Sequence, residues 1–167
     1  MIDASAVRAE LLDRDGSCRD INFTEWGTRE RASAVIAFLA DNFTFVRADD
    51  GEGHEHSLPS TIEFLKSQTG SLNLLWAKEE FIPHLQLYVY WLSEHGFFLE
   101  LTFFPQDLDP NRFDIQAFFT LLSNLVTASG SDEYYVRYEN ASWKHGDVSA
   151  SSGVIFSHHD GIPTGDG

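Results

Sequence analysis

The chain has 167 residues, with 26 acidic and 11 basic side chains, so its formal net charge is −15 at pH 7. Hydrophobic residues make up 43% of the chain and aromatic residues 14%, which excludes a disordered chain of low hydrophobicity and indicates one folded core. Because nucleic acid and anionic lipid are also negative, the charge excludes both as expected partners and favours a basic protein.

The cysteine content and the apolar runs indicate the setting of the protein. Cys18 is the only cysteine, so neither an internal disulfide nor a multi-cysteine zinc site is expected. There is no run of about 18 apolar residues that would predict a membrane helix. Residues 1–10 lack the basic and apolar regions of a secretory signal. We therefore expect a reducing compartment, the cytoplasm of a bacterium.

The N-terminal part predicts a hairpin, a helix and a strand. Residues 6–23 alternate around a glycine-containing turn, which favours a hairpin, with a helix over 4–13 as the alternative. Thr28 is the expected N-cap of a helix that runs to about Asn42, because apolar residues recur there at helical spacing. Residues 43–46 follow as a strand of aromatic and β-branched residues.

A polar loop separates this strand from a second helix and strand. Residues 49–56 are rich in acids and contain two glycines and two histidines. Pro59 or Ser60 then opens a short expected helix that closes near Gly70. Residues 71–77 alternate in side-chain character, so they predict another strand.

The segment 81–104 predicts an antiparallel hairpin, because two alternating runs flank a short turn that ends in Gly96. One face of the hairpin is expected to meet the helices through Leu85, Leu87, Val89, Trp91, Phe97, Leu99, Leu101 and Phe103. The opposite face is expected to show Gln86, Tyr88, Tyr90, Phe98, Glu100 and Thr102.

The C-terminal part predicts a long helix and several strands. Asp109-Pro110 supplies the expected N-cap and first residue of the helix, whose apolar residues recur at helical spacing until Gly130. Strands are expected at 134–139, around 142–144 and at 153–157.

Mixed helices and strands joined by hairpins indicate an α+β fold. We predict a mostly antiparallel sheet of about five to seven strands, with roughly two or three helices packed on one face. Residues 1–157 are expected to form this single globular domain. Residues 158–167, rich in histidine, aspartate and glycine, are expected to form a flexible C-terminal tail.

The loop 49–56 packs four carboxylates and two imidazoles into eight residues, which suits a metal ion, a partner or solvent. Its spacing matches no defined calcium loop, so an exposed acidic loop is the favoured interpretation. If a metal bound, His54, His56 and Asp49 would be its ligands. We expect no metal, no cofactor and no catalytic residue, since no local pattern ties a base to Cys18.

The polar side of the predicted hairpin, together with Tyr135, Arg137 and Glu139 of the next strand, forms a second candidate site. Interleaved aromatic, amide and carboxylate groups on a sheet face are typical of a protein interface. The alternatives are cover by the N-terminal hairpin or by a second copy of the chain, and a ligand pocket. Trp143 is expected to be a half-buried strand aromatic, with stacking beside Arg137 as the alternative.

In size, element order, acidic aromatic surface and the run 134–147 leading into 153–156, the chain resembles small acidic immunity proteins of bacterial contact-dependent and type VI secretion systems. The resemblance implies a protein that binds a cognate toxin and blocks its active site. Recognition residues differ between such pairs, so no contact is carried over from the family.

We therefore expect a stoichiometric inhibitor of a cognate protein toxin or another basic protein, itself a monomer or homodimer. Its expected contacts are Asp49, Asp50, Glu52, Glu55, Tyr88, Tyr90, Glu100, Tyr135 and Glu139. Two alternatives stay open. One is a metal-dependent or small-molecule enzyme that uses the loop 49–56 with His84 or His145. The other is a dimeric adaptor or regulatory domain.

Overall fold

The computed structural model describes residues 2–162, with the side chains of 147–151 outside the description. Its strands form one antiparallel sheet in the order β3-β2-β4-β5-β6-β1-β7-β8. The strands are β1 (Arg19–Asn22), β2 (Thr44–Asp50), β3 (Glu55–His56), β4 (Gly70–Lys78), β5 (Ile82–Leu92), β6 (Gly96–Phe103), β7 (Tyr135–Lys144) and β8 (Asp147–Ser157). The described residues thus hold eight strands where five to seven were expected.

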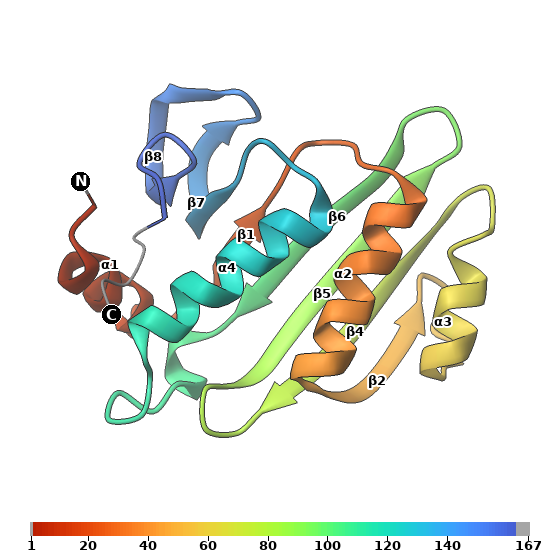
Figure 1. Ribbon diagram of the computed structural model, residues 1–167, viewed down its shortest axis with the longest axis horizontal. Helices are drawn as coiled ribbons and strands as arrows, with labels where there is room; N and C mark the ends of the chain where they lie inside the picture. The colour runs from red at the N-terminus through yellow and green to blue at the C-terminus, as the bar shows by residue number, and fades with distance from the viewer. Residues whose placement is uncertain (1, 163–167) are drawn as a thin grey trace.

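The described residues form four α-helices, where two or three were expected: α1 (Ala4–Leu12), α2 (Arg29–Asn42), α3 (Leu58–Phe64) and α4 (Ile115–Ser129). A short 3-10 helix, η1, covers Pro105–Asp107. Helices α2 and α4 lie side by side on one face of the sheet, and α3 and α1 lie near its two ends (Figure 1). The predicted α+β class is confirmed. Among the described residues, no helix has both the length and the apolar character needed to cross a membrane.

Local signals account for the elements that the sequence predicted. Thr28 Oγ1 accepts a hydrogen bond from the Arg31 N–H at 3.2 Å and caps α2. Gly130 ends α4 with a φ of +63°, in the left-handed region that favours glycine. Strands β5 and β6 form the expected hairpin, in which Tyr88 pairs with Glu100.

The N-terminal hairpin prediction is wrong. Residues 4–12 form α1, in agreement with the alternative of a helix over 4–13, because the Asp3 carboxylate accepts hydrogen bonds from two backbone N–H groups and starts a helix. The buried residues of α1, Val7 and Leu11, are one helical turn apart. Strand β1 then lies between β6 and β7 in the sheet. It thereby links the β5–β6 hairpin to the C-terminal strands, an arrangement that the sequence did not predict.

The start of α4 also differs from the prediction. The Asp109 C=O closes a turn by accepting the N–H groups of two residues that follow Pro110. Asp114 caps α4 instead, so the helix begins at Ile115. The turn allows Phe113 to enter the core, where it is 4% exposed.

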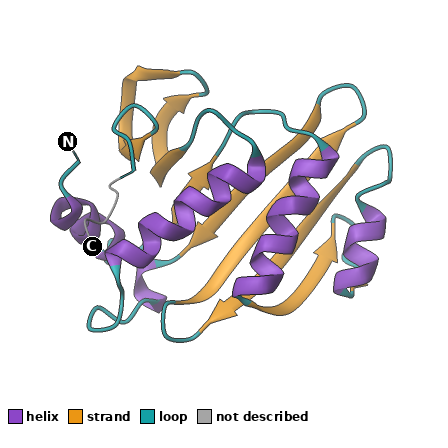
Figure 2. Cartoon of the chain, in the orientation of Figure 1, coloured by secondary structure: helices purple, strands orange, loops and turns teal. Residues whose placement is uncertain are grey.

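The core lies between the helices and one face of the sheet. All the hairpin positions predicted to face the helices are buried there, including Trp91, which is 1% exposed. On the other side of β5 and β6, the side chains are half-buried or exposed. Figure 2 shows α2 and α4 together on the first side only. The second side is therefore open over its central strands.

The segment expected to be a flexible tail is described only to Ile162. Within this segment, the His158 N–H donates a hydrogen bond to the Tyr134 C=O at 3.2 Å, which attaches His158 to the start of β7. The remaining part of the predicted tail, 163–167, lies outside the described residues.

Candidate functional site

The sheet face opposite α2 and α4, which we call the open face, carries most residues of the second candidate site, including the expected contacts Tyr88, Tyr90 and Glu100. Alternation along antiparallel strands puts every second side chain there, and the register aligns these side chains in rows across the sheet. By register, the open face includes Asp20, Asn22, Gln86, Tyr88, Tyr90, Phe98, Glu100, Thr102, Tyr135 and Arg137. Its members on β1 and β7, which are Asp20, Asn22, Tyr135 and Arg137, are buried.

Arg137 is the centre of a polar network on the open face. Its Nη2 lies 2.9 Å from Glu100 Oε2 and 3.4 Å from Asp20 Oδ2. Its Nε donates to Asn22 Oδ1 at 2.8 Å. The side chains of Arg137 and Asp20 are 8% and 7% exposed, whereas that of Glu100 is 24% exposed. Two carboxylates surround one cation, so the network retains an excess of negative charge.

Glu100 is held in one orientation by two donors. Asn22 Nδ2 donates to Glu100 Oε2 at 2.9 Å, and Arg137 donates to the same oxygen. Within the described part of the chain, no hydrogen bond reaches the other carboxylate oxygen, Oε1. A fixed and partly exposed carboxylate can bind a lysine or arginine side chain without first losing its own rotamer freedom.

Aromatic rings flank this network on both sides. The Arg137 guanidinium carbon lies 4.7 Å from the centroid of the Trp143 ring. Trp143 is thus half-buried, as expected, and it also stacks on Arg137, which was the alternative. Beyond Tyr88, which pairs with Glu100, Tyr90 packs near Trp26 with ring centroids 6.4 Å apart. The open face therefore combines large apolar rings with a fixed carboxylate.

Trp26 is a candidate contact residue that sequence reasoning missed. It lies in the loop between β1 and α2, where no alternation indicates which face a side chain joins. The backbone of Gly27 makes two hydrogen bonds with Phe97 of β6, at 2.8 and 2.9 Å, and these hold Trp26 beside Tyr90 and His95.

The expectation that Tyr135 contacts a partner is wrong, because Tyr135 is fully buried. Its hydroxyl donates to Glu133 Oε2 at 2.7 Å and accepts the Gly146 N–H at 2.7 Å. Its ring centroid lies 5.0 Å from that of Trp143. The turn of the β7–β8 hairpin therefore covers Tyr135, whereas Glu139, farther along β7, is exposed.

In the acidic loop, Asp50 is structural and is not a surface charge. Its Oδ1 accepts the N–H groups of Glu52 at 2.8 Å and His54 at 3.1 Å. Its Oδ2 lies 2.9 Å from His56 Nε2. The hydrogen bond with His56, followed by the two N–H groups, lowers the pKa of Asp50 to about 2. The expectation that Asp50 contacts a partner is therefore wrong, because this carboxylate is buried and hydrogen-bonded within the protein.

The three residues considered as metal ligands do not converge. Asp49 and Asp50 are neighbours in β2, so their side chains point to opposite sides of the sheet. His56 binds Asp50, whereas Asp49 lies on the side of Gln86 and the open face. Among the described residues, no group of three or more His, Cys, Asp or Glu side chains is arranged to hold a metal ion.

Asp50, His56 and Ser60 form a hydrogen-bonded chain in the order found in serine hydrolases. His56 Nδ1 lies 2.8 Å from Ser60 Oγ, so a ring protonated on Nε2 donates to Asp50 and accepts from Ser60. The Ser60 N–H, however, donates to Ser57 Oγ at 3.1 Å, and the preceding residue is Pro59, which has no N–H. Without free N–H donors beside Ser60, the chain holds the acidic loop to α3 and lacks an oxyanion site.

A hollow connects the acidic loop to the open face. It has a volume of about 630 Å³, and Tyr90 lines it as well as belonging to the open face. Glu52 and His54 line its loop side, and Phe64 and Trp91 add aromatic surface. The acidic loop and the open face, which the sequence presented as separate candidates, thus meet at Tyr90.

Cys18 lies beside the polar network and is not an activated nucleophile. Burial, followed by the nearby negative charge of Asp20, raises the pKa of the Cys18 thiol to about 12. A thiol with this pKa is almost entirely protonated at neutral pH and cannot act as a thiolate.

In comparisons with known proteins, no family model matches the chain, and no curated protein and no solved structure matches it.

Proposed function

We propose that the chain is a stoichiometric inhibitor of the immunity-protein type, which binds a basic bacterial effector through the open face and neutralises it. The observation that supports this most is Glu100, a partly exposed carboxylate fixed by Arg137 and Asn22 and flanked by aromatic rings. Such a site offers a lysine or arginine of the partner a charged hydrogen bond at its centre and apolar contacts around it.

The aromatic residues supply the contact area in this proposal. Tyr88, Tyr90 and Trp26 are half-buried, so each ring already has protein neighbours on one side. Ordering such rings on binding costs little conformational entropy, and tyrosine and tryptophan are enriched among residues that dominate binding energy.

In this proposal, the acidic loop attracts the basic partner electrostatically toward the open face. Glu52 and Glu55 are exposed, Glu52 lines the same hollow as Tyr90, and the whole chain carries a net charge of −15. A field of this sign raises the association rate of a basic protein by roughly 10- to 1,000-fold at low salt. The proposed setting is a bacterial cytoplasm, with neither nucleic acid nor membrane as the partner.

The test begins with capture of a one-to-one protein partner from the native cell, followed by reconstitution of the purified complex. Expression of the captured effector alone is expected to stop growth of a host cell, and coexpression of the chain is expected to restore it. Tyr88→Ala and Glu100→Gln should lose the rescue. Glu30→Gln, an exposed change on α2 away from the open face, is the matched control.

Two results would decide against the inhibitor. A concentration-independent dimer that buries Tyr88 and Tyr90, seen by light scattering and crosslinking, would favour the adaptor alternative. Hydrolysis of ester substrates that Ser60→Ala abolishes would favour an enzyme, since Asp50, His56 and Ser60 form a hydrogen-bonded series that resembles a nucleophilic site.

A further inference from the structure

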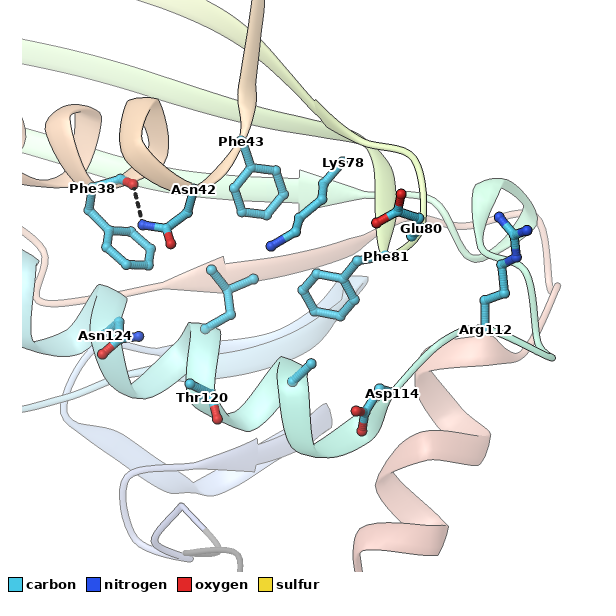
Figure 3. A pocket seen from close by; sticks show the side chains of 12 residues that line it. Phe38, Asn42, Phe43, Lys78, Glu80, Phe81, Arg112, Asp114, Thr120 and Asn124 are labelled. Atoms are coloured by element: carbon cyan, nitrogen blue, oxygen red, sulfur yellow. Dashed lines mark hydrogen bonds between the residues drawn. The ribbon is translucent and has the colours of Figure 1, made fainter.

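A cleft of about 340 Å³ opens on the helix side of the molecule, away from the open face (Figure 3). It lies between α2, α4 and the turn that joins β4 to β5. Its apolar wall consists of Phe38, Phe43, Phe81 and Leu121, and its polar lining includes Asn42, Lys78, Thr120 and Asn124. Its volume is within the range of small-molecule sites, roughly 300 to 1,000 Å³.

Two cations, Lys78 and Arg112, line this cleft, and Lys78 is the one that lies among its phenylalanines. Its ammonium group lies 5.7 Å from the centroid of the Phe43 ring and points into the space between the phenylalanines in Figure 3. Within the described part of the chain, no carboxylate lies within ion-pair distance of Lys78. By contrast, Lys66, on the segment after α3, pairs with Glu63 at 2.9 Å.

Of the other charged residues that line the cleft, Arg112 and Asp114 have partners of their own. Asp114 caps α4 by accepting the Gln116 N–H at 2.9 Å. Arg112 also lines the cleft, and its Nε lies 3.9 Å from Oδ2 of Asp109, which is not part of the lining. Glu80 lines the cleft but makes no ion pair among the described residues. Lys78 is therefore the cation of the described lining that has no ion pair, and Glu80 is a carboxylate of the same lining that has none.

We infer that the cleft binds a small organic anion with an apolar body, such as a carboxylate attached to an aromatic ring or a short alkyl chain. The apolar body fills the space against the phenylalanines, and the anion receives a charge-assisted hydrogen bond from Lys78. In a protein of net charge −15, only a local cation makes an anion the favoured ligand. This inference does not depend on the proposed inhibitor function, because the cleft and the open face lie on opposite sides of the sheet.

The experiment titrates the purified full chain with 1-naphthoate, phenylacetate and octanoate by calorimetry, and maps the bound probe by NMR shifts. We expect one saturable site for at least one of these anions, with the largest shifts at Phe43, Phe81 and Leu121. Lys78→Met retains the aliphatic stem and should weaken that binding by about tenfold, the range expected for one charged hydrogen bond. Lys66→Met is the matched control and should leave the affinity unchanged.

A neutral isostere and a cation separate charge recognition from simple apolar binding. Naphthalene-1-carboxamide should bind more weakly than the naphthoate and should not respond to Lys78→Met, and 1-naphthylmethylammonium should not bind. The inference is overturned if none of the three anions binds, if Lys78→Met binds as well as the wild type, or if the shifts map elsewhere. Shifts confined to the cleft only when an acidic peptide is added would assign it to a protein partner instead.

Discussion

The ion pair between Arg137 and Glu100, with 2.9 Å between Nη2 and Oε2, spans the whole width of β1 in the sheet. Glu100 comes from β6 and Arg137 from β7, and these strands are neighbours of β1 on its two sides. The pair therefore fastens the C-terminal strands to the centre of the sheet. It also fixes the carboxylate that the proposed function uses.

Replacing Arg137 by methionine is expected to destabilise the fold by about 3 kcal/mol or more, because two carboxylates that are largely buried lose their cation. Urea unfolding followed by fluorescence measures the change. Arg112→Met, whose side chain is 64% exposed, is the control and should stay within about 0.5 kcal/mol of the wild type. A loss below about 1 kcal/mol for Arg137→Met would mean that solvent already screens the network.

Adding one methyl group at Gly70 should destabilise the protein by about 1 to 3 kcal/mol through overpacking. A Cβ there would lie 2.5 Å from Trp91 Cζ2, and the indole cannot move away easily because its Nε1 donates to the Ser67 C=O at 2.9 Å. Gly27→Ala is the matched control, since its Cβ would meet the Phe97 C=O oxygen at an ordinary 3.6 Å. Equal unfolding midpoints for the two variants would contradict the packing argument.

Elements with a clear period over a long segment could be predicted from the sequence. The hairpin of β5 and β6 alternates over its full length, and its apolar side is buried as expected. The segment before Cys18 was too short to decide, because Val7 and Leu11 satisfy both a strand alternation and a helical repeat. Asp3, one acceptor at the start of that segment, decides for the helix by capping it.

The sequence predicted which side chains of the β5–β6 hairpin share the open face, but it did not predict their contacts with side chains from other strands. Alternation placed Tyr88 and Glu100 together, since both lie in one hairpin. It could not show that Arg137 would neutralise Glu100, because that contact requires β1, from near the N-terminus, to lie between β6 and β7. Burial of Tyr135 likewise depends on the turn at Gly146, which bends back to its hydroxyl.

Asp50→Asn should remove part of the acid sensitivity of the protein. The folded pKa of Asp50, about 2, lies below its ordinary value of 3.8, so the carboxylate contributes stability above pH 4 that is lost as the pH falls through 2. The variant should thus be less stable than the wild type at pH 5, and the difference should shrink between pH 4 and pH 2. Urea midpoints across this range measure it, with Asp41→Asn, exposed at the end of α2, as the control. A difference that does not change with pH would contradict the assignment.

Cys18 should react with iodoacetamide roughly a thousandfold more slowly in the native protein than in urea at pH 8. The pKa of its thiol is raised from 9.0 to about 12, which reduces the thiolate fraction by about three powers of ten. Mass spectrometry of timed samples gives both rates. Native labelling within about tenfold of the unfolded rate would show that the thiol is accessible and ionised, and would reopen the possibility of a nucleophilic role.

The two parts of the proposed interface should act on different rate constants for the effector. Glu52→Gln with Glu55→Gln removes exposed charge from the acidic loop, so it should lower the association rate at low salt and have little effect at about 0.5 M salt, where charges are screened. Tyr88→Ala removes contact area beside Glu100, so it should raise the dissociation rate by roughly thirtyfold, equivalent to about 2 kcal/mol. Surface plasmon resonance at several salt concentrations separates the two effects. A loop variant that changed only the dissociation rate would mean that the acidic loop makes the contact. A Tyr88→Ala variant that changed only the association rate would mean that the open face does not. Either result would contradict the proposed binding mode.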